Sequence, residues 1–312
     1  ADLIQAGYGL NPAVDAALYA HSTETGTAIA ADGPHGRLYY SAESREEILF
    51  GRYLDFEDYH SHLRGTERLE TWWGLREDLI PDLAMVERLP SANTFEPLVQ
   101  ARYRHLLEAL DRADPQIAQR TLGLMNVAYL FDPNPPPAAD LVHRAPSVAV
   151  YRNPDLRPRA YVADRALVAD SPEHALSLLL SPTFDPTTVI VEDQPAHQPL
   201  LDDPRSPNLQ SPNPPIFLPS SPNQATIQVT LAQPGYLVLM DAFYPGWRAT
   251  VDGQAADIVR AHYAFRAIAL EAGAHEVVLR YRPRSLIAGT IVSGAALIAV
   301  ALALVLSSWR KE

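Results

Sequence analysis

Three side chains around a Pro-Gly dipeptide have the types and the spacing to bind a ligand. Tyr244, Trp247 and Arg248 surround Pro245-Gly246. Aromatic faces suit the C–H surface of a sugar, and an arginine is a good charge partner for a phosphate. A structural role is the alternative, because Pro-Gly sets a tight turn and a tryptophan can close the end of a β-sheet core. The spacing therefore predicts either a glycan or lipid-phosphate contact or a structural turn.

Two adjacent tryptophans, Trp72 and Trp73, offer ring faces of the same kind. On a strand, adjacent side chains point to opposite faces of the sheet, so at most one of the two rings would be exposed. Such a ring could stack on a sugar or touch a bilayer, and core packing is the alternative. Either way, the pair is a weaker candidate than the Pro-Gly segment.

The segment Asp58, His60 and His62 has metal-ligand residue types, since alternate positions on a strand could turn both imidazoles toward one ion. No third and fourth ligands are spaced nearby in the sequence. We therefore expect a solvated polar segment here, and no metal and no cofactor.

Other chemistries are excluded by composition and by missing motifs. The 312 residues contain no cysteine, which rules out disulfides, thiolate catalysis and cysteine-ligated zinc. There is no G-x-S-x-G elbow, no glycine-rich phosphate loop and no H-E-x-x-H motif. The net charge of −12 argues against a nucleic-acid partner, because phosphates are neutralised by basic patches.

The elements that must position these side chains form two parts. Residues 1–192 predict an α+β domain with strands at 36–41, 124–131, 148–151, 160–168 and 188–191 and helices at 95–113 and 171–180. Residues 193–224 are rich in proline, serine and asparagine, which predicts a linker or a large surface loop.

Residues 225–284 predict a small antiparallel β-sandwich. Alternating apolar residues indicate strands at 225–231, 236–240, 247–251, 265–270 and 276–281, and Asp252-Gly253 is a strong hairpin signal. Arg266 is expected to pair with Asp241 or Asp252 across the sheet.

A long apolar segment follows the sandwich. Leu286 to Leu306 contains no charge and no proline, and as a helix it would rise about 30 Å, the thickness of the bilayer hydrocarbon. The sequence therefore predicts one transmembrane helix over 285–308, with membrane lipid as a partner. Its flanks are basic or aromatic at Arg280, Arg282 and Arg284 and at Trp309, Arg310 and Lys311. The first three arginines would either meet lipid phosphates or simply flank the helix, and the near balance of charge leaves the orientation open.

The C-terminal region resembles the YfhO-like bacterial membrane proteins through an ordered set of motifs. These are Tyr244-Pro-Gly-Trp247, Val251-Asp-Gly253, Tyr263-x-Phe-Arg266, Ala272-Gly-x-His-x-Val277 and Tyr281-x-Pro283. Upstream, the sequences LMNVAYLF and VYRNPDLRPRAYV and the FDP at 184–186 are also similar to that family. The resemblance covers roughly Phe95 to Leu306.

This resemblance implies a polytopic membrane protein related to glycosyltransferases of the GT-C type. These enzymes transfer sugar from a polyprenyl-phosphate donor, often onto cell-envelope polymers, and their catalytic acid usually lies in an early loop that this sequence does not contain. We therefore expect the extracytoplasmic C-terminal part of such an enzyme, not catalytic alone, with upstream transmembrane helices of the same protein as partners and residues 309–312 in the cytoplasm. The first alternative is a non-catalytic membrane-anchored domain that binds a glycan or assists assembly. An independent membrane-anchored enzyme is the second.

Overall fold

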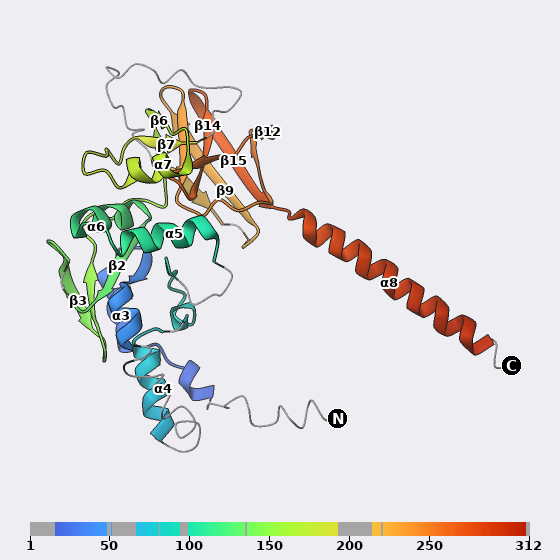
Figure 1. Ribbon diagram of the computed structural model, residues 1–312, viewed down its shortest axis with the longest axis horizontal. Coiled ribbons are helices and arrows are strands. Elements are labelled where there is room, and N and C mark those ends of the chain that lie inside the picture. Colours follow the sequence, from blue (N-terminus) through green and yellow to red (C-terminus); the bar gives the residue numbers. More distant parts are fainter. Residues whose placement is uncertain are drawn as a thin grey trace. The chain divides into compact units, whose positions relative to one another are not determined.

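The computed structural model describes residues 16–48, 51, 67–80, 82–93, 99–134, 136–192, 214–219 and 221–309. The chain forms two compact units, each containing its own sheets (Figure 1). The first unit contains Ala1–Arg159 and Leu176–Pro186, and the second contains Ala160–Ala175 and Thr187–Glu312. The chain therefore passes between the units three times.

The first unit is built on a four-stranded mixed sheet in the order β1-β2-β4-β3. Its two inner strands are antiparallel, whereas β1 pairs with β2 in parallel. The strands are β1 (Arg37–Tyr40), β2 (Val127–Asp132), β3 (Asp140–Arg144) and β4 (Ala149–Arg152).

Helices and short 3₁₀ turns complete this unit. They are η1 (Ala16–Tyr19), α2 (Glu24–Asp32), α3 (Ala42–Glu46), α4 (Glu67–Glu77), η3 (Leu83–Met85), α5 (Ala101–Leu110) and α6 (Pro115–Leu124). Local chemistry explains where α6 begins, because the Asp114 carboxylate accepts a hydrogen bond from the Gln116 N–H and Pro115 occupies the first turn. The helix α7 (Pro172–Leu179), predicted from its Ser-Pro-Glu start, lies across the division between the units.

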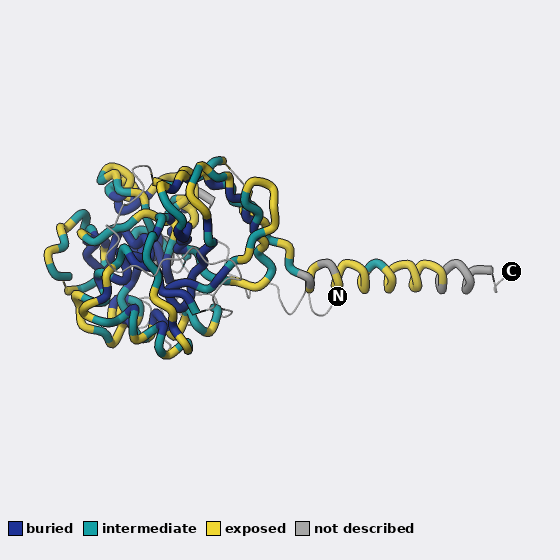
Figure 2. The backbone as a smooth tube through the Cα atoms, turned by 90° about the horizontal axis from the view of Figure 1, so that it is seen from above, coloured by how far each residue is buried: buried dark blue, intermediate teal, exposed yellow. Residues whose placement is uncertain are grey.

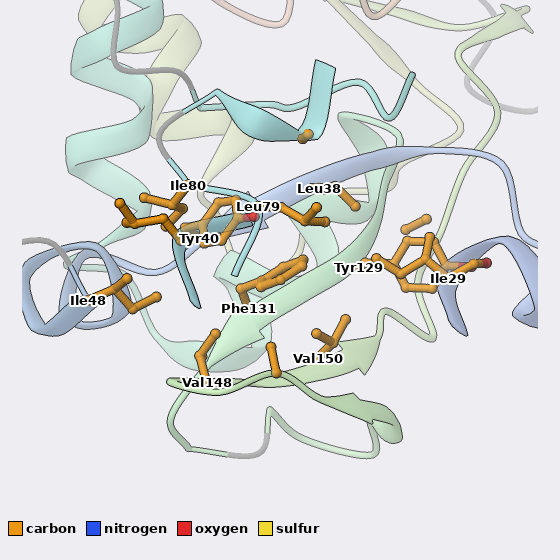
Figure 3. Close-up of a cluster of buried hydrophobic side chains, with 14 residues drawn as sticks. Ile29, Leu38, Tyr40, Ile48, Leu79, Ile80, Tyr129, Phe131, Val148 and Val150 are labelled. Carbon is orange, nitrogen blue, oxygen red and sulfur yellow. The ribbon is translucent and has the colours of Figure 1, made fainter. Parts of the chain in front are cut away.

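The core of the first unit lies against β1 and β2. Figure 3 shows Tyr40 and Phe131 at its centre, with ring centroids 4.3 Å apart. Both side chains are at most 2% exposed, and Ile80, Val148 and Val150 pack around them. Packing of this density makes the sheet a rigid base for the loops that follow its strands.

The second unit is a β-sandwich, as predicted. One sheet has the order β5-β10-β14-β13-β7-β6 and the other has the order β12-β11-β15-β9-β8. Side chains from both sheets share one hydrophobic core, including Leu237 and Ile268 from the first and Ile227 and Leu279 from the second. The strands are β5 (Ala160–Ala163), β6 (Ala166–Val168), β7 (Val189–Val191), β8 (Ile216–Leu218), β9 (Gln224–Leu231), β10 (Gly235–Leu239), β11 (Trp247–Val251), β12 (Gln254–Ala256), β13 (Val259–Ala261), β14 (Phe265–Leu270) and β15 (Gly273–Tyr281).

The structure groups the chain differently from the division expected at residue 192. The strands β5, β6 and β7 belong to the sandwich, because β5 pairs with β10 and β7 pairs with β13. Part of the expected linker is also a strand, since β8 pairs with β9. The rest of that linker, residues 193–213, lies outside the described residues. The expected fold class, α+β with a β-sandwich, is the same under either grouping.

The predicted anchor forms the α-helix α8 (Arg284–Trp309), which two residues separate from the end of β15. Its described side chains are almost all exposed, including Leu297 at 71% and Val292 at 67% (Figure 2). The transmembrane helix expected over 285–308 is not found, because no helix among the described residues is both long and apolar enough to cross a membrane.

Candidate functional site

The turn between β10 and β11 lies against the residues that precede α8. Gly246 has φ of +108°, a backbone conformation that glycine adopts without strain. The backbone N–H of Arg282 donates to the Gly246 carbonyl at 2.7 Å, and Trp247 is the register partner of Tyr281. The Pro-Gly turn is therefore fixed next to the root of the helix.

Three rings meet at this place, which we call the aromatic corner: Tyr244, Trp247 and Tyr281. The ring centroids of Trp247 and Tyr281 are 5.4 Å apart, and those of Tyr244 and Tyr281 are 6.1 Å apart. Trp247 is partly buried and packs against the sandwich core, whereas Tyr244 is 51% exposed. Trp247 thus has the structural role, closing the end of the sandwich core, that was the alternative for the Pro-Gly segment. Tyr244 has the ring face that a ligand can reach.

A buried ion pair supports the corner from inside the sandwich. Arg266 is 4% exposed, and its Nη2 lies 3.2 Å from Oδ2 of Asp241. Its guanidinium carbon lies 4.5 Å from the centre of the Trp247 ring, a distance typical of a cation–π interaction. The predicted pairing of Arg266 with Asp241 is therefore confirmed.

The other carboxylate considered for Arg266 has different partners. Asp252 accepts a hydrogen bond from the Glu276 backbone N–H at 2.9 Å, and Nδ1 of His275 lies 2.7 Å from its Oδ2. The backbone N–H of Glu276, and next His275, lower the pKa of Asp252. These contacts hold the β11–β12 hairpin against β15 and contribute nothing to the corner.

Exposed arginines lie beside the corner on the outer face of the second sheet. Ala249 and Leu279 point into the core, so the alternation of side chains turns the preceding Arg248 and the following Arg280 outward. Arg248 and Arg280 are direct register partners, and Arg280 also donates to Oε1 of Gln224 at 3.2 Å. We call Arg248, Arg280 and the exposed Arg282 the basic edge.

The electrostatics of the basic edge favour an anion. Like charges directly opposite each other on neighbouring strands repel, which costs stability. A phosphate between Arg248 and Arg280 would remove that repulsion and could accept bidentate hydrogen bonds from a guanidinium. The geometry therefore suits an anionic group, with the Tyr244 ring available to whatever the anion carries.

The remaining candidate residues lie elsewhere. Trp72 and Trp73 are on the helix α4 of the first unit, so the strand alternation assumed for them is wrong. Both are partly buried, and Trp72 packs against the core of that unit. The backbones of Arg284 and Trp309 begin and end α8, whereas Arg310 and Lys311 lie outside the described residues.

The expectation about metal ions is only partly covered by the structure. Asp58, His60 and His62 lie outside the described residues. Within the described ranges, no group of three or more histidine or acidic residues is arranged to hold a metal ion.

Sequence reasoning missed the contribution of Tyr281 to this site. The residue was recognised only as part of a motif, because its position opposite Trp247 depends on the register of β11 and β15. Alternation along the two strands could have indicated that both rings face the same side, but not that they lie opposite each other.

Comparison with known protein families finds one match. Residues 213–293 match the family described as Bacterial membrane protein YfhO. The match begins just before β8, ends within α8, and contains the aromatic corner and the basic edge. The resemblance predicted from the motifs is thereby confirmed over this stretch. No curated protein and no solved structure matches the chain.

Proposed function

We propose that this chain is the extracytoplasmic C-terminal part of a bacterial membrane protein of the YfhO family that transfers sugar from a lipid-linked donor to a cell-envelope polymer. The catalytic region lies upstream, as in the GT-C-type enzymes that the motifs resemble. One observation carries the proposal: the matched stretch, 213–293, contains an aromatic corner and a basic edge directly beside the start of α8. A sugar, a phosphate and an apolar chain are the three parts of a lipid-linked sugar.

Membrane attachment through α8 is the first component of the proposal. The described apolar side chains of this helix are exposed, and Leu286, Ile291 and Ile298 are each more than 60% exposed to solvent. Burying them in lipid or against upstream helices would stabilise the protein by about 25 cal/mol for each Å² removed from water. The description of the matched family as membrane proteins supports this location. The bulk of the chain lies on the extracytoplasmic side.

Phosphate contact by the basic edge is the second component. Only two residues separate β15 from α8, so lipid around α8 would bring phosphate head groups close to Arg280 and Arg282. Arg248 adds a third cation from the neighbouring strand. Tyr244 then stacks on a sugar attached to the bound phosphate.

Sugar transfer by the whole protein tests this proposal. The product of the complete reading frame is compared with its R248Q/R280Q variant in membranes supplied with a radiolabelled polyprenyl-phosphate sugar. We expect transfer to fall by roughly 100- to 10,000-fold, because the variant loses two charge-assisted hydrogen bonds and each one weakens binding by about 1.5–3 kcal/mol. The exposed Arg112, in the first unit, provides the control R112Q, which should transfer normally.

Two results contradict the proposal. One is full activity of R248Q/R280Q at equal expression. The other is sugar transfer by the isolated 312-residue chain, which would place the catalytic residues within it and support an independent membrane-anchored enzyme.

A non-catalytic glycan-binding or assembly role is the second candidate, and the exposed ring of Tyr244 favours it. In that case the isolated chain should bind purified envelope polymer, and Y244A should weaken binding roughly 5- to 100-fold through loss of about 1–3 kcal/mol, by analogy with aromatic stacking on bases. Binding unchanged by Y244A would remove this candidate.

A further inference from the structure

The first unit contains a cavity that the proposed function does not use. It has a volume of about 490 Å³, within the usual range for small-molecule sites. Ser41, just after β1, and Asp132, the last residue of β2, line one side, and residues of α5 and α6 line the other. β1 and β2 are parallel, so their carboxyl ends meet at this edge, where ligands commonly bind in α/β sheets.

The lining combines carboxylates with apolar side chains. Among the described residues, the lining includes the carboxylates of Glu43, Asp111 and Asp132 and no lysine, arginine or histidine. Arg45, which is outside the lining, pairs with Asp111 at 3.2 Å, so Glu43 and Asp132 carry the charge available to a ligand. Leu110, Leu122 and Leu130 are among the apolar residues of the wall. The cavity thus offers negative charge and hydrogen-bond acceptors next to a hydrocarbon surface.

The donors among the lining side chains already have acceptors. The Tyr39 hydroxyl donates to Oδ1 of Asp111 at 2.6 Å, and burial, followed by the charge of Asp111, raises the pKa of Tyr39 well above its usual value. Asn134 donates its backbone N–H to Asp132 at 3.0 Å and its side-chain amide to Glu43 at 3.3 Å. A ligand in this cavity must therefore bring donors of its own.

Gln119 provides a further acceptor for a ligand that carries donors. This cavity-lining side chain is 7% exposed, and its Nε2 donates to Oδ2 of Asp155 at 2.8 Å. That bond fixes the orientation of the amide, because a flipped amide would place its oxygen against the Asp155 carboxylate. Among the described residues, Oε1 of Gln119 then has no hydrogen-bond partner. A buried acceptor without a donor is uncommon, so a ligand that donates a hydrogen bond to Oε1 would satisfy it.

We propose that this cavity binds a small organic ammonium compound. An ammonium group supplies donors and positive charge and brings no acceptor that would need a partner. A neutral polyol would bring as many acceptors as donors, and its acceptors would find few donors here. A metal ion is the poorer fit, since the described carboxylates do not converge as a metal-holding group. The carbon chain of the ligand packs against the leucine wall.

A matched pair of ligands tests the assignment. The full chain, in a mild detergent at low salt, is titrated by calorimetry with 1,5-diaminopentane and with 1,5-pentanediol, which has the same carbon chain but no charge. We expect the diamine to bind at least tenfold more tightly than the diol. Asp132→Asn and Glu43→Gln should each weaken diamine binding by roughly tenfold, as expected for a lost charge-assisted hydrogen bond.

The control variant is Glu46→Gln. Glu46 is an exposed carboxylate on the same helix as Glu43 and does not line the cavity, so its neutralisation should leave the affinity unchanged. Glu43 is itself exposed, which keeps Glu43→Gln informative even if Asp132→Asn impairs folding. An equal loss in Glu46→Gln and Glu43→Gln would show general attraction to an acidic surface and overturn the proposal. Equal binding of diol and diamine, or no diamine binding at millimolar concentration, would also overturn it.

Discussion

Replacing Gly246 with alanine should destabilise the β-sandwich more than the same change at another left-handed glycine. A Cβ at this position would lie 3.1 Å from Cα of Pro283 and 3.1 Å from Cε2 of Tyr281. The Pro283 contact is with backbone, which cannot rotate away. The positive φ of +108° adds strain for any residue with a side chain.

The magnitude follows from these two effects. An alanine in the left-handed region costs about 1–2 kcal/mol. Forcing an additional methyl group into a packed site costs a further 1–3 kcal/mol or so. We therefore expect the free energy of unfolding to fall by roughly 2–5 kcal/mol in G246A, measured by urea unfolding followed by circular dichroism.

Gly253 provides the matched control. It also has a positive φ, +82°, but a Cβ there would meet nothing within 4 Å. G253A should therefore lose only the conformational part, about 1–2 kcal/mol. A G246A loss no larger than that of G253A would refute the argument that the turn is clamped against Pro283.

Three further predictions concern buried groups. Asp241→Asn should lower the free energy of unfolding by about 2–4 kcal/mol in a urea titration, because it leaves Arg266 buried without a full counter-charge. Burial lowers the pKa of His262 to about 3, so an unfolded chain binds one more proton between pH 3 and 6.5. Above pH 6.5 the neutral His262 therefore costs the folded protein no stability. As the pH falls from 6.5 toward 3, the free energy of unfolding decreases by up to about 1.4 kcal/mol per pH unit, and His262→Asn should reduce that slope. Phe131→Ala should cost about 3–5 kcal/mol in the first unit, measured by thermal unfolding.

Each of these has an outcome that contradicts it. Asp252→Asn is the control for Asp241→Asn, since Asp252 is exposed, solvent screens its charge, and its loss should cost less than the loss of Asp241. Equal losses in Asp241→Asn and Asp252→Asn would mean that the buried ion pair of Arg266 stabilises the fold no more than an exposed pair does. An unchanged pH slope in His262→Asn would assign the acid sensitivity to other groups. A Phe131→Ala loss below about 1 kcal/mol would show that the core collapses around the removed ring.

The sandwich strands were predictable where the local pattern is strong. Val251 and Gln254 pair across the two-residue loop Asp252-Gly253, and both loop residues have positive φ, as the hairpin signal requires. The strand β9 alternates over its length and was predicted almost to the residue. Strands of three residues, such as β12 and β13, are too short to show alternation and were missed.

Pairing between distant segments left no local signal. The strand β7 reads as a short apolar run, and nothing near it indicates a partner at β13. This is why the expected division at residue 192 cuts through a sheet. The helix α6 does have a local signal, because Asp114 caps it and Pro115 occupies its first turn, so its start was predictable from the sequence.

The candidate site was predictable in its residues but not in its arrangement. The Pro-Gly turn and Trp247 were identified from their types, and Arg266 from its position in a strand. Which face each side chain occupies depends on register, and a shift of one residue would exchange all of them. The cavity beside β1 was not predictable, because its carboxylates come from three separate segments of the sequence.

The three passages of the chain between the units have a consequence for folding during synthesis. The strands β5 and β7 emerge from the ribosome before β10 and β13, their partners in the sheet. At about 5–20 residues per second, β7 waits roughly 4 to 14 s for β13. During that time the apolar Val189–Val191 exposes an unpaired edge of the kind that promotes aggregation. The first unit, complete at Pro186, can fold before the sandwich has its strands, so the N-terminal half gains its structure first.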